Sequence, residues 1–183
     1  MNETDTPKAE TEGGRHEAEE REENARKARE TVERLFPSHE WRKVEDGIYL
    51  SPNRPVGKKS PYKTELQNAR ILRDSGSTVY LAPERKDSEE KQPDAIVNGL
   101  MFEFKNVGGN ANTLAALFLR SRSQAPNVFI NLENSTLTRS EVMTALRGAR
   151  HSKTHTNRRG DTIKGYADIN QFDGGRIVLK LKE

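Results

Sequence analysis

The sequence predicts an α/β (α+β) fold, in which a central mixed β-sheet is flanked by helices and preceded by a charged helical N-terminal extension. Three observations lead to this prediction. Short runs of β-branched and aromatic residues alternate with helical apolar spacing between residues 63 and 132. Asn98-Gly99 joins two of these runs and is the strongest short-range hairpin signal, because a type I′ turn needs positive φ at both central residues. Residues 15–34 are mostly Glu, Arg, Lys and Ala, which are good helix formers.

Composition fits a domain of common size with extensions. The chain has 183 residues, of which 32% are hydrophobic and 32% charged, so part of it is expected to lie outside any core. No apolar stretch approaches the roughly 20 residues of a membrane span, and no secretory signal peptide is visible. Cysteine is absent, which excludes disulfides and thiolate metal sites. The net charge is only +3, but acids crowd the first third of the chain and bases crowd residues 147–164.

The extension is expected to be a charged helical or disordered tail or linker over residues 1–36, with the folded domain over residues 37–183. Its apolar positions make a thin seam, comprising Ala18, Ala25, Ala28, Val32 and Leu35. Such a seam fits either a weak coiled-coil stripe or a solvated single helix, and small alanines favour the solvated helix because they bury little area. Pro37 then ends the helix.

The first elements of the domain lead to the hairpin. An apolar patch is expected at Trp41 and residues 48–50, followed by a proline-rich loop over residues 51–61. Lys58 and Lys59 in this loop are either solvated or in contact with a phosphate. A helix is expected over residues 63–74, ending at Gly76, and a strand over residues 77–82.

The elements after the hairpin alternate again. Gly108-Gly109 allow the backbone to approach a ligand closely, a helix is expected over residues 112–122, and an apolar strand over residues 127–132 is expected to be central in the sheet. Thr138 and Glu141 have the spacing of a capping box that opens another helix.

The end of the chain carries two further strand-like runs. Residues 163–169 and 176–181 are expected to form a terminal hairpin, joined through Asp173-Gly174-Gly175.

A two-residue turn fixes the register of the hairpin within residues 93–105. The expected pairs are Val97 with Leu100, Ile96 with Met101, Ala95 with Phe102, and Asp94 with Glu103. Since side chains alternate across a strand, one face carries Asp94, Ile96, Met101, Glu103 and Lys105. The other face is apolar and suited to the core, with Ala95, Val97, Leu100, Phe102 and Phe104.

Asp94 and Glu103 would then face each other with Cβ atoms roughly 5 Å apart, where two like charges repel. A divalent cation would turn this repulsion into chelation by hard oxygens, the ligand set that suits Mg²⁺ or Mn²⁺. Lys105 projects from the same face, where it could hold a water or stabilise charge developing on a phosphate. The alternative is a surface hairpin whose charges are merely solvated.

Glu65 falls in the first turns of the helix over residues 63–74. There it either favours the positive end of the helix macrodipole, or adds a carboxylate near the metal within hydrogen-bond reach of a bound water. The sequence leaves both interpretations open.

Bases concentrate late in the chain. The cluster comprises Arg147, Arg150, His151, Lys153, His155, Arg158, Arg159 and Lys164. Such a cluster is expected of a protein that binds a polyanion, and a solvated loop is the rival explanation.

Pro93-Asp94 on one strand and Glu103-Phe104-Lys105 on the next resemble the motif of the PD-(D/E)XK phosphodiesterase superfamily. The predicted order of helix, three strands, helix and strand from Lys63 to Leu132 is similar to its common core. More narrowly, residues 61–150 resemble the C-terminal tRNA nuclease domains of contact-dependent growth inhibition (CdiA-type) toxins and related polymorphic toxins.

This resemblance implies a metal-dependent endonuclease, a hydrolase of phosphodiester bonds, with RNA and in particular tRNA as the favoured substrate. It implies that Asp94, Glu103 and the Phe104 backbone carbonyl bind Mg²⁺ or Mn²⁺, with Zn²⁺ as a further candidate. Glu65 would assist, and Lys105 would position or activate the water. The implied partners are nucleic acid and a cognate immunity protein, without a membrane, and the implied site of action is the cytoplasm of a cell into which the toxin is secreted or delivered.

The chain also departs from those toxins, because neither their large delivery region nor their Val-Glu-Asn-Asn junction is visible. An excised domain and a stand-alone protein are therefore both open. A DNA nuclease of a phage or defence system remains an alternative function, as does a non-catalytic nucleic-acid-binding or phage structural module on the same fold.

Overall fold

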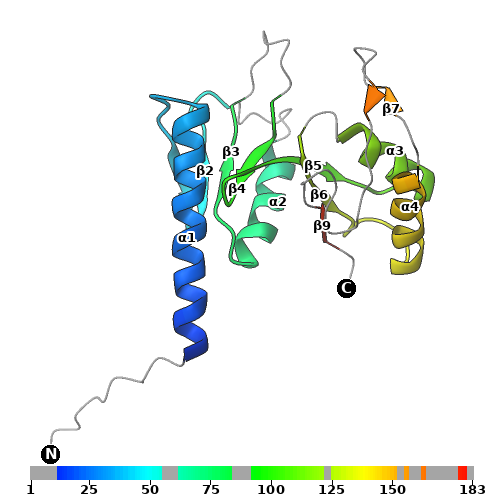
Figure 1. Ribbon diagram of the computed structural model, residues 1–183, viewed down its shortest axis with the longest axis horizontal. Helices are drawn as coiled ribbons and strands as arrows, with labels where there is room; N and C mark the ends of the chain where they lie inside the picture. The colour runs from blue at the N-terminus through cyan, green and yellow to red at the C-terminus, as the bar shows by residue number, and fades with distance from the viewer. Residues whose placement is uncertain are drawn as a thin grey trace, which may run out of the picture.

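The fold is a mixed β-sheet with helices on both faces, as the sequence predicts (Figure 1). The computed structural model describes residues 12–54, 62–83, 92–121, 125–151, 155–156, 162–163 and 177–180. Within these ranges the helices are α1 (Glu12–Leu35), α2 (Tyr62–Asp74), α3 (Ala111–Ser121) and α4 (Arg139–His151). The strands are β1 (Arg42–Glu45), β2 (Ile48–Leu50), β3 (Val79–Leu81), β4 (Ala95–Val97), β5 (Leu100–Asn106), β6 (Asn127–Asn131), β7 (His155–Thr156), β8 (Thr162–Ile163) and β9 (Ile177–Lys180).

The main sheet has the strand order β1-β2-β3-β4-β5-β6-β9. The pairs β1–β2, β3–β4 and β4–β5 are antiparallel, whereas β2–β3, β5–β6 and β6–β9 are parallel. The predicted succession of helix, three strands, helix and strand is confirmed as α2, β3, β4, β5, α3 and β6. The central position of β6 is also confirmed, since it pairs with β5 on one side and β9 on the other.

The terminal hairpin expected from residues 163–169 and 176–181 lies mostly outside the described residues and stays a prediction. In the described part of the chain, β8 pairs antiparallel with β7 in a separate two-stranded sheet, while β9 pairs parallel with β6. The pairing of β9 with β6, a partner far away in sequence, is a contact that the sequence did not predict.

The helices divide the core into clusters on the two faces of the sheet. α2 covers one face, where Ala69 and Leu72 pack with Phe102, Phe104 and Phe129. The opposite face is shared: α1 packs there with Tyr80 and Ile96, and α3 and α4 pack there with Val128 and Ile130. Figure 1 shows α1 at one side of the molecule and the α3–α4 pair at the other.

The capping-box helix forms as the sequence predicts. The Thr138 amide donates to the Glu141 carboxylate at 2.7 Å, and the Glu141 amide donates to Thr138 Oγ1 at 3.3 Å. These reciprocal bonds satisfy amides that the first turn of α4 would leave without partners.

Helix α1 is more than a solvated extension. Ala28, Val32 and Phe36 recur at four-residue spacing and are buried against Tyr80, Ala82 and Ile96. Fully burying a valine contributes about 1.5 to 3 kcal/mol, so this stripe is sufficient to dock the helix. The expectation of a helix solvated all round was therefore wrong for its second half, although residues 13–22 are exposed.

The hairpin register is confirmed, since Val97 pairs with Leu100, Ile96 with Met101 and Ala95 with Phe102. Asn98 and Gly99 have φ values of 50° and 84°, as a type I′ turn requires.

The confirmed register bears out the two predicted faces, but the burial of two residues differs from what was expected. Ile96, on the face of Asp94 and Glu103, is fully buried under α1. Leu100, expected in the core, is 39% exposed because pairing with β6 begins only at Phe102, so the first residues of β5 extend beyond their neighbour.

Gly99 also marks a close contact between the hairpin and α1. A Cβ atom at this position would lie 2.9 Å from the Lys27 carbonyl oxygen, and Thr31 Oγ1 donates to the Gly99 carbonyl at 3.1 Å. Gly99→Ala is therefore expected to lower the free energy of unfolding by about 1 to 3 kcal/mol, through both its positive φ and this contact. Urea denaturation measures the effect.

Gly13→Ala is the matched control, because no atom of the described residues lies within 4 Å of a Cβ atom there. We expect a change within about 0.5 kcal/mol for this exposed position. A loss of equal size in both variants would contradict the docking of α1 on the hairpin turn.

Candidate functional site

The hairpin brings the predicted carboxylates together. Asp94 directly precedes β4, and Glu103 lies in β5 with 2% of its surface exposed. Because Ala95 pairs with Phe102 in the β4–β5 ladder, the register places Asp94 opposite Glu103, and alternation puts both side chains on the same face. Asp94 Oδ2 also accepts a hydrogen bond of 2.7 Å from the Phe104 amide, which fixes this side chain against β5. The geometry on which the metal hypothesis depends is therefore present.

Lys105 joins the same group. Its Nζ pairs with Glu103 Oε1, and its side chain keeps 21% of its surface exposed, whereas that of Glu103 keeps 3%. The second carboxylate oxygen, Glu103 Oε2, is buried and has no hydrogen-bond partner among the residues that the structure describes. A buried carboxylate oxygen without a donor is costly, and a cation is one ligand that would satisfy it.

Burial and mutual repulsion perturb the titration of both acids. Burial, and then the charge of Asp94, raise the pKa of Glu103 to about 7, against the opposing effect of Lys105. Burial also raises the pKa of Asp94, although the Phe104 amide and the charges of Lys105 and Arg54 act in the other direction. Titratable groups perturbed in this way are typical of functional sites.

The site lies between two helical layers on one face of the sheet. In the parallel β5–β6 ladder, Glu103 is in register with Val128 and Lys105 with Ile130. These two neighbours pack under α3 and α4, whereas Ile96 on the same face packs under α1. The carboxylates therefore occupy the strip of sheet between these coverings.

Glu65 lies in the first turn of α2, as both interpretations of this residue require. Its carboxylate is buried, forms an ion pair with Arg54 and raises the pKa of Glu103 through its charge. Its part in holding a metal-bound water stays a prediction.

Arg54 is a site residue that the sequence did not reveal. Its guanidinium contacts the Glu65 carboxylate and the carbonyl oxygens of Ala82 and Asp94. In the loop over residues 51–61 the sequence singled out only Lys58 and Lys59 as possible phosphate contacts, and both lie outside the described residues. An isolated arginine beside prolines carries no signal of burial.

The predicted nucleic-acid-binding bases cannot be placed in the same way. Arg147, Arg150 and His151 fall in the last turns of α4 and His155 in β7, where only the backbone is described. Lys153, Arg158, Arg159 and Lys164 lie outside the described residues. Their role stays a prediction.

The donor set fits a hard divalent cation with limited protein ligation. No group of three or more His, Cys, Asp or Glu side chains that could hold a metal occurs among the described residues. Asp94 and Glu103 would therefore supply only two carboxylate ligands, to which a backbone oxygen and water would have to be added. Mg²⁺ is commonly bound by one or two carboxylates and keeps several waters. The Phe104 carbonyl is suitable, because the N–H and C=O of one strand residue point to the same edge and its N–H points to Asp94.

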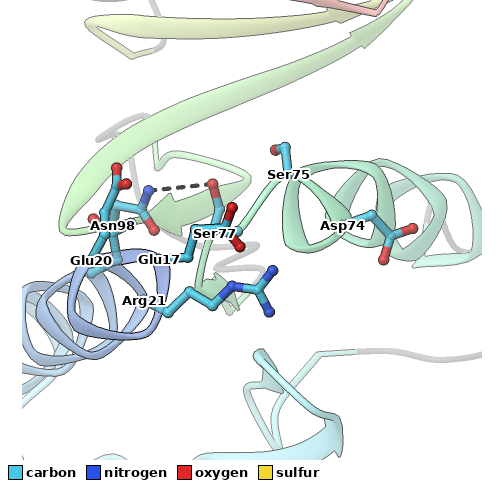
Figure 2. Close-up of a pocket in the computed structure, with 9 residues that line it drawn as sticks. Glu17, Glu20, Arg21, Asp74, Ser75, Ser77 and Asn98 are labelled. Carbon is cyan, nitrogen blue, oxygen red and sulfur yellow. Dashed lines mark hydrogen bonds between the residues drawn. The ribbon is translucent and has the colours of Figure 1, made fainter. Parts of the chain in front are cut away.

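A polar cavity of about 340 Å³ lies at the opposite end of β4 from Asp94. It is lined by Glu17, Glu20, Arg21, Asn24, Asp74, Ser75, Gly76, Ser77 and Asn98. Figure 2 shows the Asn98 amide donating to Ser77 Oγ, at 3.2 Å, while the Asp74 carboxylate points away from this pair. None of the predicted site residues lines this cavity, so it is separate from the carboxylate site.

The raised pKa of Glu103 predicts an unusual dependence of stability on pH. The folded protein keeps this proton up to about pH 7, whereas an ordinary glutamate releases it near 4.5. The stability due to the proton is therefore fully present below pH 4.5 and is lost as the pH rises through 7. We expect the metal-free protein to lose roughly 1 to 3 kcal/mol of unfolding free energy between pH 5 and 8 from this group.

Urea denaturation in chelator across this range measures the effect, and Glu103→Gln should reduce it. Glu141→Gln is the control, because the Thr138 hydrogen bonds lower the pKa of that exposed carboxyl and give the opposite sign. An unchanged pH dependence in Glu103→Gln would contradict this account of the buried acid.

The segment that begins with the hairpin is similar to a known protein family. A family model described as the contact-dependent growth inhibition CdiA C-terminal domain matches residues 91–165. This segment contains Asp94, Glu103 and Lys105 but not Arg54 or Glu65. No curated protein matches the chain.

Among solved structures, the chain is similar to one from a CdiA-CT/CdiI toxin and immunity complex from Burkholderia pseudomallei. The two are 23% identical with a TM-score of 0.46, over 63% of this chain and 98% of the other. In the described part of the chain, no helix is long and apolar enough to cross a membrane.

Proposed function

We propose that this protein is a metal-dependent nuclease of the PD-(D/E)XK type that hydrolyses phosphodiester bonds in nucleic acid. The observation that carries the proposal is the buried Glu103 carboxylate, which lies opposite Asp94, pairs with Lys105 through one oxygen and has no partner for the other among the described residues. A fold gains little stability from placing two buried acids together. Binding of a divalent cation and a phosphate at this site would explain why the two acids lie together.

Asp94, Glu103 and the Phe104 carbonyl would hold Mg²⁺ or Mn²⁺, with Zn²⁺ as a further candidate. Such an ion polarises a phosphate oxygen and lowers the pKa of a bound water. Glu103, whose pKa is near 7, would have to lose its proton before binding it. Glu65 would accept a hydrogen bond from water at the edge of the site.

Lys105 would act directly on the reacting phosphate. Its ammonium lies beside Glu103 and is partly exposed, so it can approach a substrate while remaining next to the metal ligands. From there it would position the attacking water and stabilise the negative charge that develops on the phosphate.

RNA, and tRNA in particular, is the favoured substrate, and the cluster of bases between residues 147 and 164 would bind its phosphates. This preference rests on the resemblance of residues 61–150 to tRNA nuclease domains of such toxins, since the contact-dependent growth inhibition model that matches residues 91–165 names no substrate. The same match supports a toxin delivered into target cells, where it would act in the cytoplasm. A cell that makes such an enzyme needs protection from it, so we propose a cognate immunity protein as a partner.

Incubating the protein with total tRNA and with plasmid DNA, with Mg²⁺ or Mn²⁺ and with excess chelator, tests the proposal. We expect metal-dependent cleavage of tRNA that chelator stops. Cleavage of plasmid alone would instead favour a DNA nuclease of a phage or defence system. If the protein binds RNA or DNA tightly but leaves it intact with every metal tested, the nuclease proposal is wrong and a non-catalytic binding module is favoured.

A further inference from the structure

We propose that Arg54 is a positioning residue that holds the carboxylate site together from outside the segment matched by the family model. The inference rests on the proposed function, because it assigns Arg54 a role in that same site. Arg54 precedes the matched residues 91–165 by a long stretch of chain, yet its side chain, only 3% exposed, lies at the site.

The guanidinium contacts three separate segments. One nitrogen pairs with the Glu65 carboxylate in the first turn of α2. The other terminal nitrogen, Nη1, donates to the carbonyl oxygen of Ala82, just after β3. It also lies 3.5 Å from the carbonyl oxygen of Asp94, just before β4. Arg54 thus connects α2 to the two strand ends next to the site.

This contact acts on the backbone that carries Asp94. The Asp94 carbonyl also accepts from the Ala82 amide at 3.0 Å, so the guanidinium sits where β3 and β4 finish their ladder. Beyond this point the Asp94 side chain must turn to accept from the Phe104 amide and meet Glu103. By holding the backbone at Asp94, the guanidinium would set the distance between the Asp94 and Glu103 carboxylates.

Arg54 is itself held by ordered contacts. Its amide donates to the Ser51 carbonyl at 3.1 Å, and the Ser51 amide donates to the Leu81 carbonyl at 3.3 Å. The Ser51 hydroxyl lies 2.7 Å from His39 Nε2, in the segment that follows α1. The backbone of Arg54 is therefore held next to β3, and its side chain extends from there to the site.

The geometry requires arginine and not merely a positive charge. A guanidinium presents several donors in a rigid planar fork, whereas a lysine ammonium is a compact point charge on a flexible stem. Lysine could pair with Glu65, but it could not also hold both carbonyl oxygens in the same plane. Arg54→Lys therefore separates positioning from charge.

The test compares Arg54→Lys, Arg54→Met and the control Arg70→Met in the full chain. Arg70 lies on the same helix as Glu65 but pairs with Glu45 at an exposed surface, with half of its side chain accessible. Circular dichroism first establishes that each variant is folded at the assay temperature. Electron paramagnetic resonance of free Mn²⁺ then gives the Mn²⁺ Kd, and tRNA cleavage gives kcat and KM.

We expect Arg54→Lys to be folded, with an Mn²⁺ Kd raised about ten-fold or more and kcat lowered about 10- to 100-fold, since residues that orient metal ligands have effects of this size. KM should change less, because the Arg54 side chain is only 3% exposed and so is not available to bind substrate directly. Arg54→Met should be at least as impaired, and Arg70→Met should match the wild type. A general loss of stability is not expected to change Kd and kcat while leaving KM nearly unchanged.

A folded Arg54→Lys with wild-type Kd and kcat overturns the proposal, and this variant decides the matter if Arg54→Met does not fold. An Arg70→Met variant as impaired as Arg54→Lys also overturns it, because the effect would not be specific to the site. If the wild-type chain neither binds Mn²⁺ nor cleaves nucleic acid, the proposed function fails and the role of Arg54 fails with it.

Discussion

Asp94→Ala is expected to lower kcat for tRNA cleavage by at least about a thousand-fold, which corresponds to about 4 kcal/mol of transition-state stabilisation. The side chain lies between the Phe104 amide and Glu103, so its loss removes one proposed metal ligand and releases the other from its neighbour. Cleavage assays over a range of Mn²⁺ concentrations would show whether more metal restores the rate.

Asp94→Asn refines this test. An asparagine oxygen can still accept from the Phe104 amide, so the fold of the hairpin is retained while the charge is lost. The control is Asp74→Asn, since Asp74 is 67% exposed at the end of α2 and pairs with Arg73. Cleavage by Asp94→Asn within about ten-fold of the wild type would rule out Asp94 as a metal ligand in the reaction.

Lys105→Met is expected to give the second largest effect, a fall in kcat of about a hundred- to ten-thousand-fold. Unlike Asp94, Lys105 competes with a cation for Glu103, because its ammonium pairs with Glu103 Oε1. Removing the ammonium should therefore leave Mn²⁺ affinity unchanged or higher while the chemical step fails. Mn²⁺ titration and single-turnover cleavage of tRNA measure the two effects separately.

Lys43→Met provides the matched control, because Lys43 forms an exposed pair with Asp46 on β1. It should affect neither affinity nor rate, as exposed ion pairs contribute little. If Lys105→Met lost affinity and activity together, its function would be to shape the metal site and not to assist catalysis.

The hairpin could be predicted from the sequence because its determinants are local. Asn98 and Gly99 dictate the turn, the turn dictates the register, and the register puts Asp94 and Glu103 on one face. The capping box of Thr138 and Glu141 was predictable for the same reason.

The missed features depend on partners that are distant in sequence. Val32 is buried because Tyr80 and Ile96 form an apolar surface that no inspection of the α1 sequence could reveal. Arg54 acquires its role only when β3 and β4 bring Ala82 and Asp94 beside it. β9 pairs with the edge of β6, again a contact fixed by tertiary structure.

The most direct test of the account is calorimetric titration of the wild-type protein with Mn²⁺ near pH 6.5, in two buffers of different ionisation enthalpy. A cation shared by Asp94 and Glu103 must displace the proton that Glu103, with its pKa of about 7, still holds at this pH. We expect Mn²⁺ binding with proton release, and a loss of that release in Glu103→Gln. An absence of binding at millimolar Mn²⁺, or binding with proton release unchanged in Glu103→Gln, would contradict the proposed metal site.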